Sequence, residues 1–465
     1  MQRAAVINAV GLTETLLGPN TPRLSAFRQK GQLAAITPAF PAVTCTAQSN
    51  YLTGQPPARH GIVGNGWYDR DLAEVHFWKQ SDHLVQARKI WEELRQANPR
   101  FTCAKLFWWF NMYSSADYSI TPRPMYPADG RKIFDIYTWP FPLRAEIKQD
   151  LGEFPFASFW GPAAGADTPQ GRADAATRWI AESAKWIETR YQPTLSLIYL
   201  PHLDYNLQRL GPDDPAIARD VQALDAIAGD LIAFFQGRGI RVVVLSEYGL
   251  VSVRHPIHLN RIFRKQGWVA IKEELGHEML DCGASKVFAV ADHQAAHIYI
   301  NESSLAKSVR GLLESQPGIA EVLAKTEPGG INHPRAGDLI ALASEQSWFT
   351  YYYWLDDGRA PDFARCVDIH RKPGYDPVEL FLDPKLRLPK LKIAWRLLQK
   401  KLGFRMLMDV IPLEASLVKG SHGVRPAMVG DYPILIAEKG LEGIGNRIDS
   451  TQVYDILKQQ VAEVA

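Results

Sequence analysis

Three neighbouring stretches determine the fold class of this chain: TLSLIYL (194–200), ARDVQALDAIAGDLIAFFQ (218–236) and IRVVVLS (240–246). The first and third are short runs of apolar and β-branched residues, each followed by a polar turn, which is typical of buried parallel strands. The second repeats its apolar residues with the period of a helix. Strand, helix and strand in this order predict an α/β fold, a largely parallel sheet with helices on both faces. AAVINAV (4–10) predicts another strand of the same sheet.

Composition and net charge limit the class of protein and the partners that we expect for this chain. The chain has 465 residues, of which 46% are hydrophobic and 22% are charged, as in an ordinary globular protein. A formal net charge of +2 gives no reason to expect nucleic acid as a partner. We find no charged leader before an apolar run and no run of membrane-spanning length, so we expect a cytoplasmic protein. The scattered cysteines form no CxxC pair and are expected to be reduced and mostly buried: Cys45, Cys103, Cys282 and Cys366.

Polar residues follow the predicted strands. In a parallel sheet ligands bind beyond the carboxyl ends of the strands, so these positions are candidates for a site. They are Asn8, then His202 and Asp204, then Glu247 and Tyr248. Asp, Glu and His at such positions are the ligands that a divalent metal ion needs, although a polar residue leaving a strand also often caps the next helix.

The segments FPAVTCTAQSNYLTG (40–54) and HGIVGN (60–65) complete a pattern that spans most of the chain. In this order the segments resemble the type I phosphodiesterase and nucleotide pyrophosphatase family of the alkaline phosphatase superfamily, which also includes phosphonoacetate hydrolase. The resemblance implies one alkaline-phosphatase-like α/β domain over residues 1–465, with inserted cap-like segments. It places the catalytic nucleophile on Thr44, at a helix N-terminus, and a donor to the phosphoryl oxygen on Asn65. A threonine hydroxyl needs a metal ion or a base to become nucleophilic, and both the helix N-terminus and the amide stabilise negative charge on phosphoryl oxygens.

The metal ligands depart from the family pattern. The resemblance implies two metal ions held by three Asp and three His, but this chain has Asn8 for one Asp and Gln208 for one His. Glu247 and Tyr248 stand where the family has Asp and His, while Asp204 and His422 are kept. Asn and Glu still offer oxygen, whereas a neutral Tyr is a poor ligand. We therefore expect a divalent metal, with zinc implied by the resemblance and manganese or magnesium as alternatives, bound as one or two ions by Asn8, Asp204, Glu247 and His422.

Other residues are candidates to replace the lost ligands. VDIHRKPGYDP (367–377) offers Asp368 and His370, and VADHQAAH (290–297) offers Asp292 and His293. His202 is a further candidate ligand. The alternative for each histidine is a hydrogen-bonded side chain that holds a loop. Replacement requires Asp368 or His370 to lie within coordination distance of Asp204 and His422.

Three further segments bear on substrate and partner. Residues 101–160 are unusually aromatic and proline-rich and predict a cap-like excursion, in which Arg123, Arg131 and Lys132 offer positive charge to a substrate; a plain aromatic minicore is the alternative. Residues 350–412 predict an insertion near the site. LKIAWRLLQKKL (391–402) predicts a basic amphipathic helix, which either makes peripheral contact with a membrane or packs on its own domain.

Two functions follow from these observations. The first is a metal-dependent hydrolase of a phosphodiester, pyrophosphate or phosphonate, which attacks a small-molecule phosphoester with Thr44. The second is a catalytically impaired relative that binds a phosphorylated metabolite or lipid, because Asn8, Gln208 and Tyr248 are three losses from a site whose ligands act together.

Overall fold

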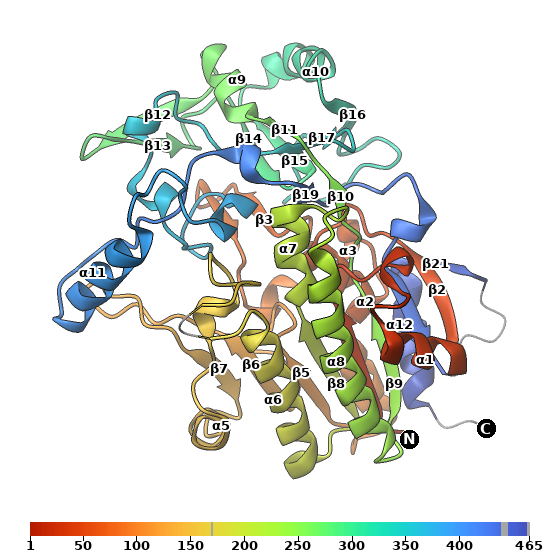
Figure 1. Cartoon of the computed structure of the whole chain (residues 1–465). Coiled ribbons are helices and arrows are strands. Elements are labelled where there is room, and N and C mark those ends of the chain that lie inside the picture. The colour runs from red at the N-terminus through yellow and green to blue at the C-terminus, as the bar shows by residue number, and fades with distance from the viewer. Residues whose placement is uncertain (169–170, 439–444, 463–465) are drawn as a thin grey trace.

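The computed structural model describes residues 1–168, 171–438 and 445–462. Its centre is a nine-stranded sheet (Figure 1). From one edge to the other the strands are β21 (Arg447–Asp449), β2 (Gln32–Thr37), β20 (Ile434–Ala437), β9 (Arg241–Leu245), β1 (Ala4–Ala9), β8 (Leu195–Leu200), β5 (Cys103–Leu106), β6 (Tyr118–Pro122) and β7 (Ile136–Trp139).

The middle of this sheet is parallel, which confirms the prediction from the three stretches. β1 lies between β8 and β9, with Ala4 opposite both Leu195 and Arg241. β5 and β6 continue the parallel order, whereas β20 and β7 run antiparallel to their neighbours. Every residue of β1 and β8 is buried, as continuous apolar runs require when both faces of a sheet are covered.

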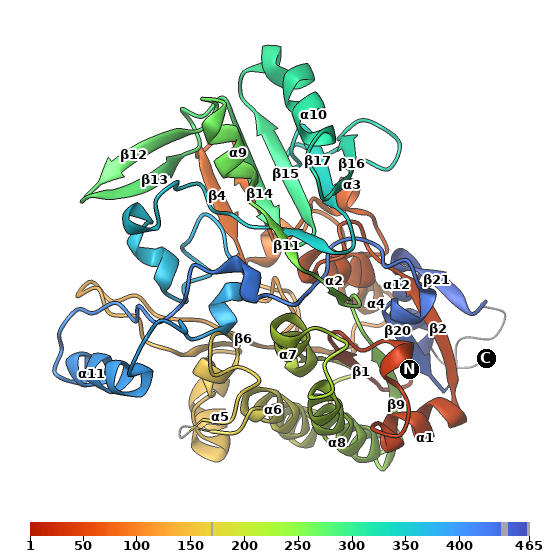
Figure 2. The same ribbon diagram turned by 45° about the horizontal axis from the view of Figure 1, so that its top comes forward.

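Helices cover both faces of the sheet (Figure 2). α6 (Ala175–Tyr191) and α8 (Ile217–Gln236) contact one face, and α8 buries the apolar side that its helical repeat predicts. α2 (Thr44–Thr53), α4 (Ile90–Ala97) and α12 (Val453–Val461) lie together on the other face. Further helices are α1 (Pro22–Lys30), α3 (Pro57–His60), α5 (Leu143–Leu151) and α7 (His202–Leu210).

A second, four-stranded antiparallel sheet lies beyond one end of the main sheet, at the top of Figure 1. Its strands are β14 (Val287–Asp292), β15 (Ala295–Ile300), β17 (Leu339–Ala343) and β16 (Ile319–Ala324), and α9 (Leu259–Lys265) and α10 (Ala306–Glu314) pack on it. The tight turn between β14 and β15 carries Asp292 and His293 back toward the main sheet. Short two-stranded sheets complete the fold: β3 (Gly66–Asp69) with β4 (Glu74–Phe77), β10 (Val251–Ser252) with β19 (Gly420–Ser421), β11 (His255–Ile257) with β18 (Ser347–Phe349), and β12 (Ala270–Glu274) with β13 (His277–Asp281).

The segment 101–160 differs from the expected excursion. It supplies β5, β6 and β7 to the main sheet, so much of its aromatic content belongs to the core. Residues 350–412 consist mostly of loops and short turns and include α11 (Pro389–Lys401). All four cysteines are free and buried, as expected. No helix within the described residues is long and apolar enough to cross a membrane.

A buried ion pair holds the loops of 350–412 together. Lys372 donates to Glu379, which also accepts a hydrogen bond from Trp160 Nε1 at 3.0 Å, and both charged side chains are at most 3% exposed. Replacing Lys372 by methionine leaves a buried carboxyl without its counter-charge, so we expect the free energy of unfolding to fall by about 3–5 kcal/mol in urea titrations. The control, Lys286→Met, breaks an exposed pair with Glu302 and should cost less than about 1 kcal/mol. Equal losses in both variants would contradict this prediction.

Candidate active site

A small cavity of about 40 Å³ lies beyond the carboxyl end of the main sheet. Thr44 lines it as the first residue of α2, where the chain turns from an extended Val43 into the helix. The Thr44 side chain is 2% exposed. The other lining residues come from several elements: Trp78, Trp109, Phe159, Trp160, Tyr199, Pro201, Asp204, Tyr205, Gln208, Tyr248, His293, Ile369, Tyr375 and His422. We call this the inner cavity.

Asn65 is held beside the start of α2. Its Oδ1 accepts from the Cys45 N–H at 3.0 Å, and its Nδ2 donates to Asp292 Oδ1 at 3.0 Å and to the Tyr375 hydroxyl at 3.4 Å. Asp292 Oδ2 also accepts from the Asn65 N–H at 2.7 Å. The second sheet therefore fixes the orientation of the amide relative to Thr44.

Tyr248 connects Thr44 to Asp204. The tyrosine hydroxyl lies 3.3 Å from Thr44 Oγ1 and donates to Asp204 Oδ1 at 3.1 Å, while Gln208 donates to Asp204 Oδ2 at 2.6 Å. The Tyr248 ring stacks on His422, with centroids 3.6 Å apart and planes 5° apart. Burial raises the pKa of Asp204 to about 7, although the hydrogen bonds from Tyr248 and Gln208 oppose this shift.

A second network surrounds Glu247. Its Oε1 accepts from Asn8 Nδ2 and from Gln48 Nε2, each at 2.5 Å. Burial raises the pKa of Glu247 to about 8, against the effect of these donors and of Thr44. Burial also lowers the pKa of His422 to about 3, and burial together with His422 holds the pKa of His293 well below its usual range. Both histidines are therefore neutral at pH 7.

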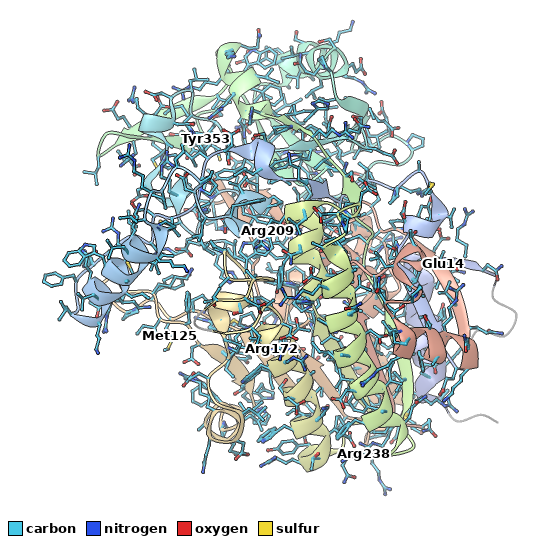
Figure 3. The ribbon with its side chains drawn as sticks, in the orientation of Figure 1. Glu14, Met125, Arg172, Arg209, Arg238 and Tyr353 are labelled. Atoms are coloured by element: carbon cyan, nitrogen blue, oxygen red, sulfur yellow. The ribbon has the colours of Figure 1, made fainter. Side chains whose placement is uncertain are left out.

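A larger basic cavity of about 630 Å³ lies next to the inner one, and Trp78 lines both. We call it the outer cavity. Its basic residues are Lys79, Arg123, Arg131, His370 and Arg371. Within the described chain, Lys79, Arg123 and Arg371 form no ion pair with a carboxylate. Much of the wall is the loop between β6 and β7, whose Met125 lies below α11 at the left of Figure 3.

The family is decided by a comparison of the whole sequence. The model of the type I phosphodiesterase / nucleotide pyrophosphatase family matches residues 4–376, which include Thr44, Asn65, Asp204 and Glu247. The chain belongs to this family. Its alkaline-phosphatase-like α/β fold agrees with that assignment.

Relatives and solved structures of this family are distant. An uncharacterized pyrophosphatase/phosphodiesterase of Schizosaccharomyces pombe is 24% identical over 269 residues, which are 53% of this chain and 46% of that protein. The chain thus matches about half the length of this curated relative. Phosphonoacetate hydrolase of Sinorhizobium meliloti, solved with phosphonoformate, has a TM-score of 0.61 at 13% identity, covering 99% of this chain and 96% of its own. Human ectonucleotide pyrophosphatase/phosphodiesterase 5 has a TM-score of 0.59 at 15% identity, covering 99% and 95%; at these identities the likeness shows the fold alone.

The residues present do not fit the two-metal ligand set that the family resemblance implies. Among the described residues, no group of three or more His, Cys, Asp or Glu side chains is placed to hold a metal ion. Amide donors occupy both Asp204 and Glu247, and Tyr248 stands between Thr44 and Asp204. The structure thus differs from the prediction of one metal site built from Asn8, His202, Asp204, Glu247, Asp368, His370 and His422.

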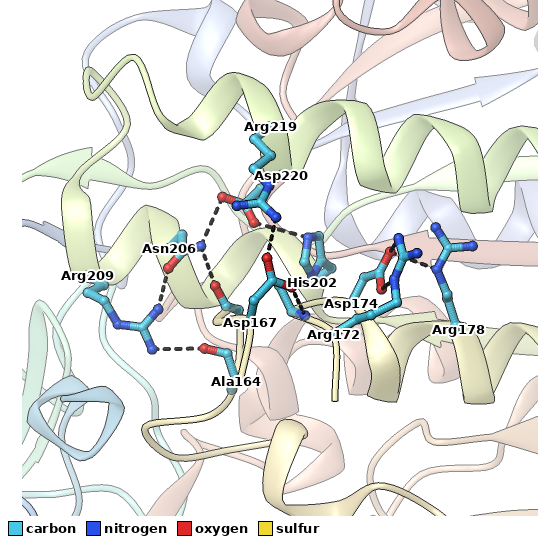
Figure 4. Close-up of polar contacts among 12 residues, drawn as sticks. Ala164, Asp167, Arg172, Asp174, Arg178, His202, Asn206, Arg209, Arg219 and Asp220 are labelled. Carbon is cyan, nitrogen blue, oxygen red and sulfur yellow. Dashed lines mark hydrogen bonds and ion pairs between the residues drawn. The ribbon is translucent and has the colours of Figure 1, made fainter. Parts of the chain in front are cut away.

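His202 differs most plainly from a metal ligand. It lies with Asp204 in the first turn of α7, so the two side chains do not share one face. His202 Nε2 is 3.1 Å from Asp220 Oδ1, and Asp220 also accepts from Asn206 Nδ2 at 2.9 Å (Figure 4). The histidine therefore ties α7 to α8. Side chains two residues apart on a helix point in different directions, so His202 does not face the same site as Asp204.

His370 lines the outer cavity and Asp368 lies two residues before it, and neither replaces the lost ligands. Asp368 pairs with Lys132 at 3.1 Å and accepts from the Tyr126 hydroxyl. His370 Nδ1 is 3.0 Å from the Trp78 carbonyl oxygen, and its ring lines the outer cavity. Their loop runs along the wall between the two cavities, and the sequence motif could not show which cavity its histidine faces.

Sequence reasoning missed several residues of the inner cavity. Tyr375 bonds His293 at 2.5 Å as well as Asn65, and Trp78 and Trp109 pack against each other with centroids 4.5 Å apart. Trp78 and His293 also adopt left-handed backbone conformations, with φ of 53° and 60°. Such strained residues are common at functional sites. Neither feature has a sequence signal beyond the aromatic residues themselves.

Proposed function

We propose that this chain hydrolyses a small anionic phosphodiester, pyrophosphate or phosphonate, with Thr44 as the nucleophile. Family membership supports a hydrolase of this class. The observation that carries the proposal is the position of Thr44, a buried hydroxyl at the N-terminus of α2 that faces a cavity and adjoins the Tyr248–Asp204 pair.

The chain's own residues supply the steps. Thr44 Oγ1 attacks phosphorus and forms a P–O bond while the bond to the leaving group breaks. The threonine proton passes to the Tyr248 oxygen as the tyrosine donates its own proton to Asp204, along the two hydrogen bonds already present. The positive end of α2 and the Asn65 amide, whose longer bond to Tyr375 is the weaker one, stabilise charge on the phosphoryl oxygens. A water oxygen then attacks phosphorus, the bond from phosphorus to Thr44 Oγ1 breaks, and Asp204 returns the proton through Tyr248 to Thr44 Oγ1, while the remaining water proton leaves with the phosphate product.

The outer cavity is proposed to hold the rest of the substrate. It shares the Trp78 wall with the inner cavity, so a molecule whose phosphorus lies at Thr44 extends directly into it. Arg123 and Arg371 offer guanidinium groups with no carboxylate partner among the residues that the structure describes, which suit a second phosphate or a carboxylate. Lys132 remains a candidate contact, although its ion pair with Asp368 reduces the charge it offers. One structurally similar protein supports this proposal: mouse ectonucleotide pyrophosphatase/phosphodiesterase 5 was solved as an inactive variant with AMP.

Replacing Arg123 and Arg371 by alanine should weaken binding of anionic substrates without disturbing the attack by Thr44. We expect KM to rise about ten-fold for each arginine and kcat to change less than about two-fold, since each charged contact is worth about 1.5 kcal/mol. Steady-state kinetics measures KM and kcat with a nucleotide diester and with a diester whose leaving group is uncharged. The rise in KM should be smaller for the diester with the uncharged leaving group. The control is Arg238→Ala, at the far end of α8 (Figure 3). A KM unchanged in both arginine variants would remove the outer cavity from the substrate site.

The function itself is tested by turnover. The purified chain is assayed against aryl phosphodiesters, aryl phosphonates, nucleoside diphosphates and dinucleoside polyphosphates, with and without added zinc, manganese or magnesium. Release of the leaving group, lost in the Thr44→Ala variant, supports the proposal. Binding of these compounds without turnover under any condition would leave the chain a binding protein of this family.

A further inference from the structure

The helix α11 is amphipathic with its apolar side facing solvent. None of its residues is buried. Leu391, Trp395, Leu398 and Leu402 follow each other at helical spacing and are 64%, 56%, 45% and 64% exposed. Leu388 and Phe404 extend this surface at the two ends, at 66% and 62% exposed. We call these six residues the apolar stripe.

The polar side of α11 attaches it to the protein. Lys392 Nζ donates to the Asp409 carbonyl oxygen at 2.7 Å and pairs with its carboxylate at 2.9 Å, and Arg396 pairs with the same carboxylate at 3.0 Å. A helix that packs on its own domain buries its apolar side instead. The orientation seen here is therefore the reverse of an ordinary surface helix, and both Figure 1 and Figure 2 show α11 standing out from the body.

The charge around the stripe has one sign. Residues 386–405 contain seven Lys or Arg and no Asp or Glu. Arg387, Lys390, Lys401 and Arg405 are exposed beside the apolar stripe. Apolar side chains including a Trp, flanked by Lys and Arg, are the composition of helices that lie in the interface of an anionic membrane. A single exposed apolar patch of this size also needs a partner in a soluble protein.

We propose that the apolar stripe of α11 docks the protein on the surface of a bilayer that contains anionic lipids. The stripe enters the boundary between headgroups and acyl chains, and the four exposed cations lie at the level of the lipid phosphates. No membrane-spanning helix is required for this mode of binding.

The docking surface adjoins the outer cavity. Arg405 Nε donates to the Asp129 carbonyl oxygen at 2.7 Å, in the loop whose Gly130 and Arg131 line that cavity. Lys400 Nζ lies 5.4 Å from the centre of the Phe134 ring, in the same loop. A docked α11 thus brings the mouth of the outer cavity to the headgroups. This inference about the substrate rests on the proposed function. The substrates that reach Thr44 at a docked α11 are then phosphodiesters of lipid headgroups.

Vesicle sedimentation tests the docking with the full chain. We expect it to bind vesicles of phosphatidylcholine with about 30% phosphatidylserine at least about ten-fold more tightly than pure phosphatidylcholine, and to lose most of this preference near 0.5 M salt. The double variant Trp395→Glu/Leu398→Glu should lower binding about ten-fold or more, and Lys390→Glu/Lys401→Glu should abolish the preference for anionic lipid. The control is Leu275→Glu, which replaces a fully exposed leucine by glutamate in the turn between β12 and β13.

Two results would overturn the docking. One is a wild-type chain that stays in the supernatant with both kinds of vesicle; the other is equal sedimentation of the Trp395→Glu/Leu398→Glu variant. If light scattering instead shows a wild-type dimer that this variant converts to a monomer, with no vesicle binding, the stripe is a protein interface. Vesicle binding is measured without turnover, so a chain that binds anionic vesicles but cleaves no phosphodiester keeps the docking and refutes the proposed function alone.

Discussion

The Thr44→Ala variant is expected to lose turnover of every phosphodiester, pyrophosphate and phosphonate substrate by about 10⁴-fold or more. Removing the nucleophile of a covalent mechanism costs this much because the remaining groups only bind and polarise the substrate. Tyr248, 3.3 Å from the Thr44 hydroxyl, also bonds Asp204, and Glu247 also accepts from Asn8 and Gln48, so neither is left without a partner when the hydroxyl is removed. The free energy of unfolding should therefore change by less than about 1 kcal/mol, as measured by urea titration of both proteins.

Two matched variants separate the nucleophile from the helix that carries it. Thr44→Ser keeps a hydroxyl and should retain measurable turnover together with a phosphorylated residue 44 that can be trapped by acid quench and mass spectrometry. Thr46→Ala removes a second buried hydroxyl of α2, one that bonds the Ile62 carbonyl oxygen away from the cavity, and should leave kcat within about three-fold. Turnover that survives in the Thr44→Ala variant would show that another group is the nucleophile.

The sequence could predict the centre of the fold but not its second sheet. β1, β8 and β9 are continuous apolar runs, and such runs carry a local signal for buried strands of a parallel sheet, although Ala4 of β1 pairs with the distant Leu195 and Arg241. The pairing of β15 with β17 joins Ala295 to Leu342 across an intervening helix and strand. Antiparallel register over that separation depends on contacts that no local pattern contains. The sequence therefore predicts Asp292 and His293 as candidate residues, but it does not predict that their turn lies beside Thr44 and Asn65.

The sequence also could not predict the direction in which a helix or a side chain faces. The pattern of 391–402 predicts an amphipathic helix, and α11 covers that stretch, but only the bonds from Lys392 and Arg396 to Asp409 decide that its polar side faces inward. The same limit applies to Asp368 and His370. Their residue types suit a metal, yet their direction depends on Lys132 and the Trp78 carbonyl oxygen, which are distant in sequence.

Restoring the family ligands at three positions should create a zinc site. Asn8→Asp, Gln208→His and Tyr248→His in one protein replace groups that already converge on Glu247 and Asp204, at 2.5, 2.6 and 3.1 Å. Carboxylate and imidazole are strong zinc ligands, whereas amide and phenol are weak ones, so we expect zinc affinity to rise about 10³-fold or more, equivalent to about 4 kcal/mol. Competition with a chromophoric chelator measures the affinity, and Gln222→His, on the exposed side of α8, controls for an added surface histidine.

The stability of this variant supplies an independent readout. Asn8→Asp places a second carboxylate against Glu247 Oε1, where the amide now donates, and like charges in a buried site repel unless a cation lies between them. Without metal the triple variant should therefore melt below the wild type, and zinc should raise its Tm by several degrees while leaving the wild-type Tm unchanged. A wild-type chain that gains as much Tm from zinc as the triple variant would show that its own residues already form a tight metal site. A triple variant that gains nothing would show that positions 8, 208 and 248 cannot act as one ligand set.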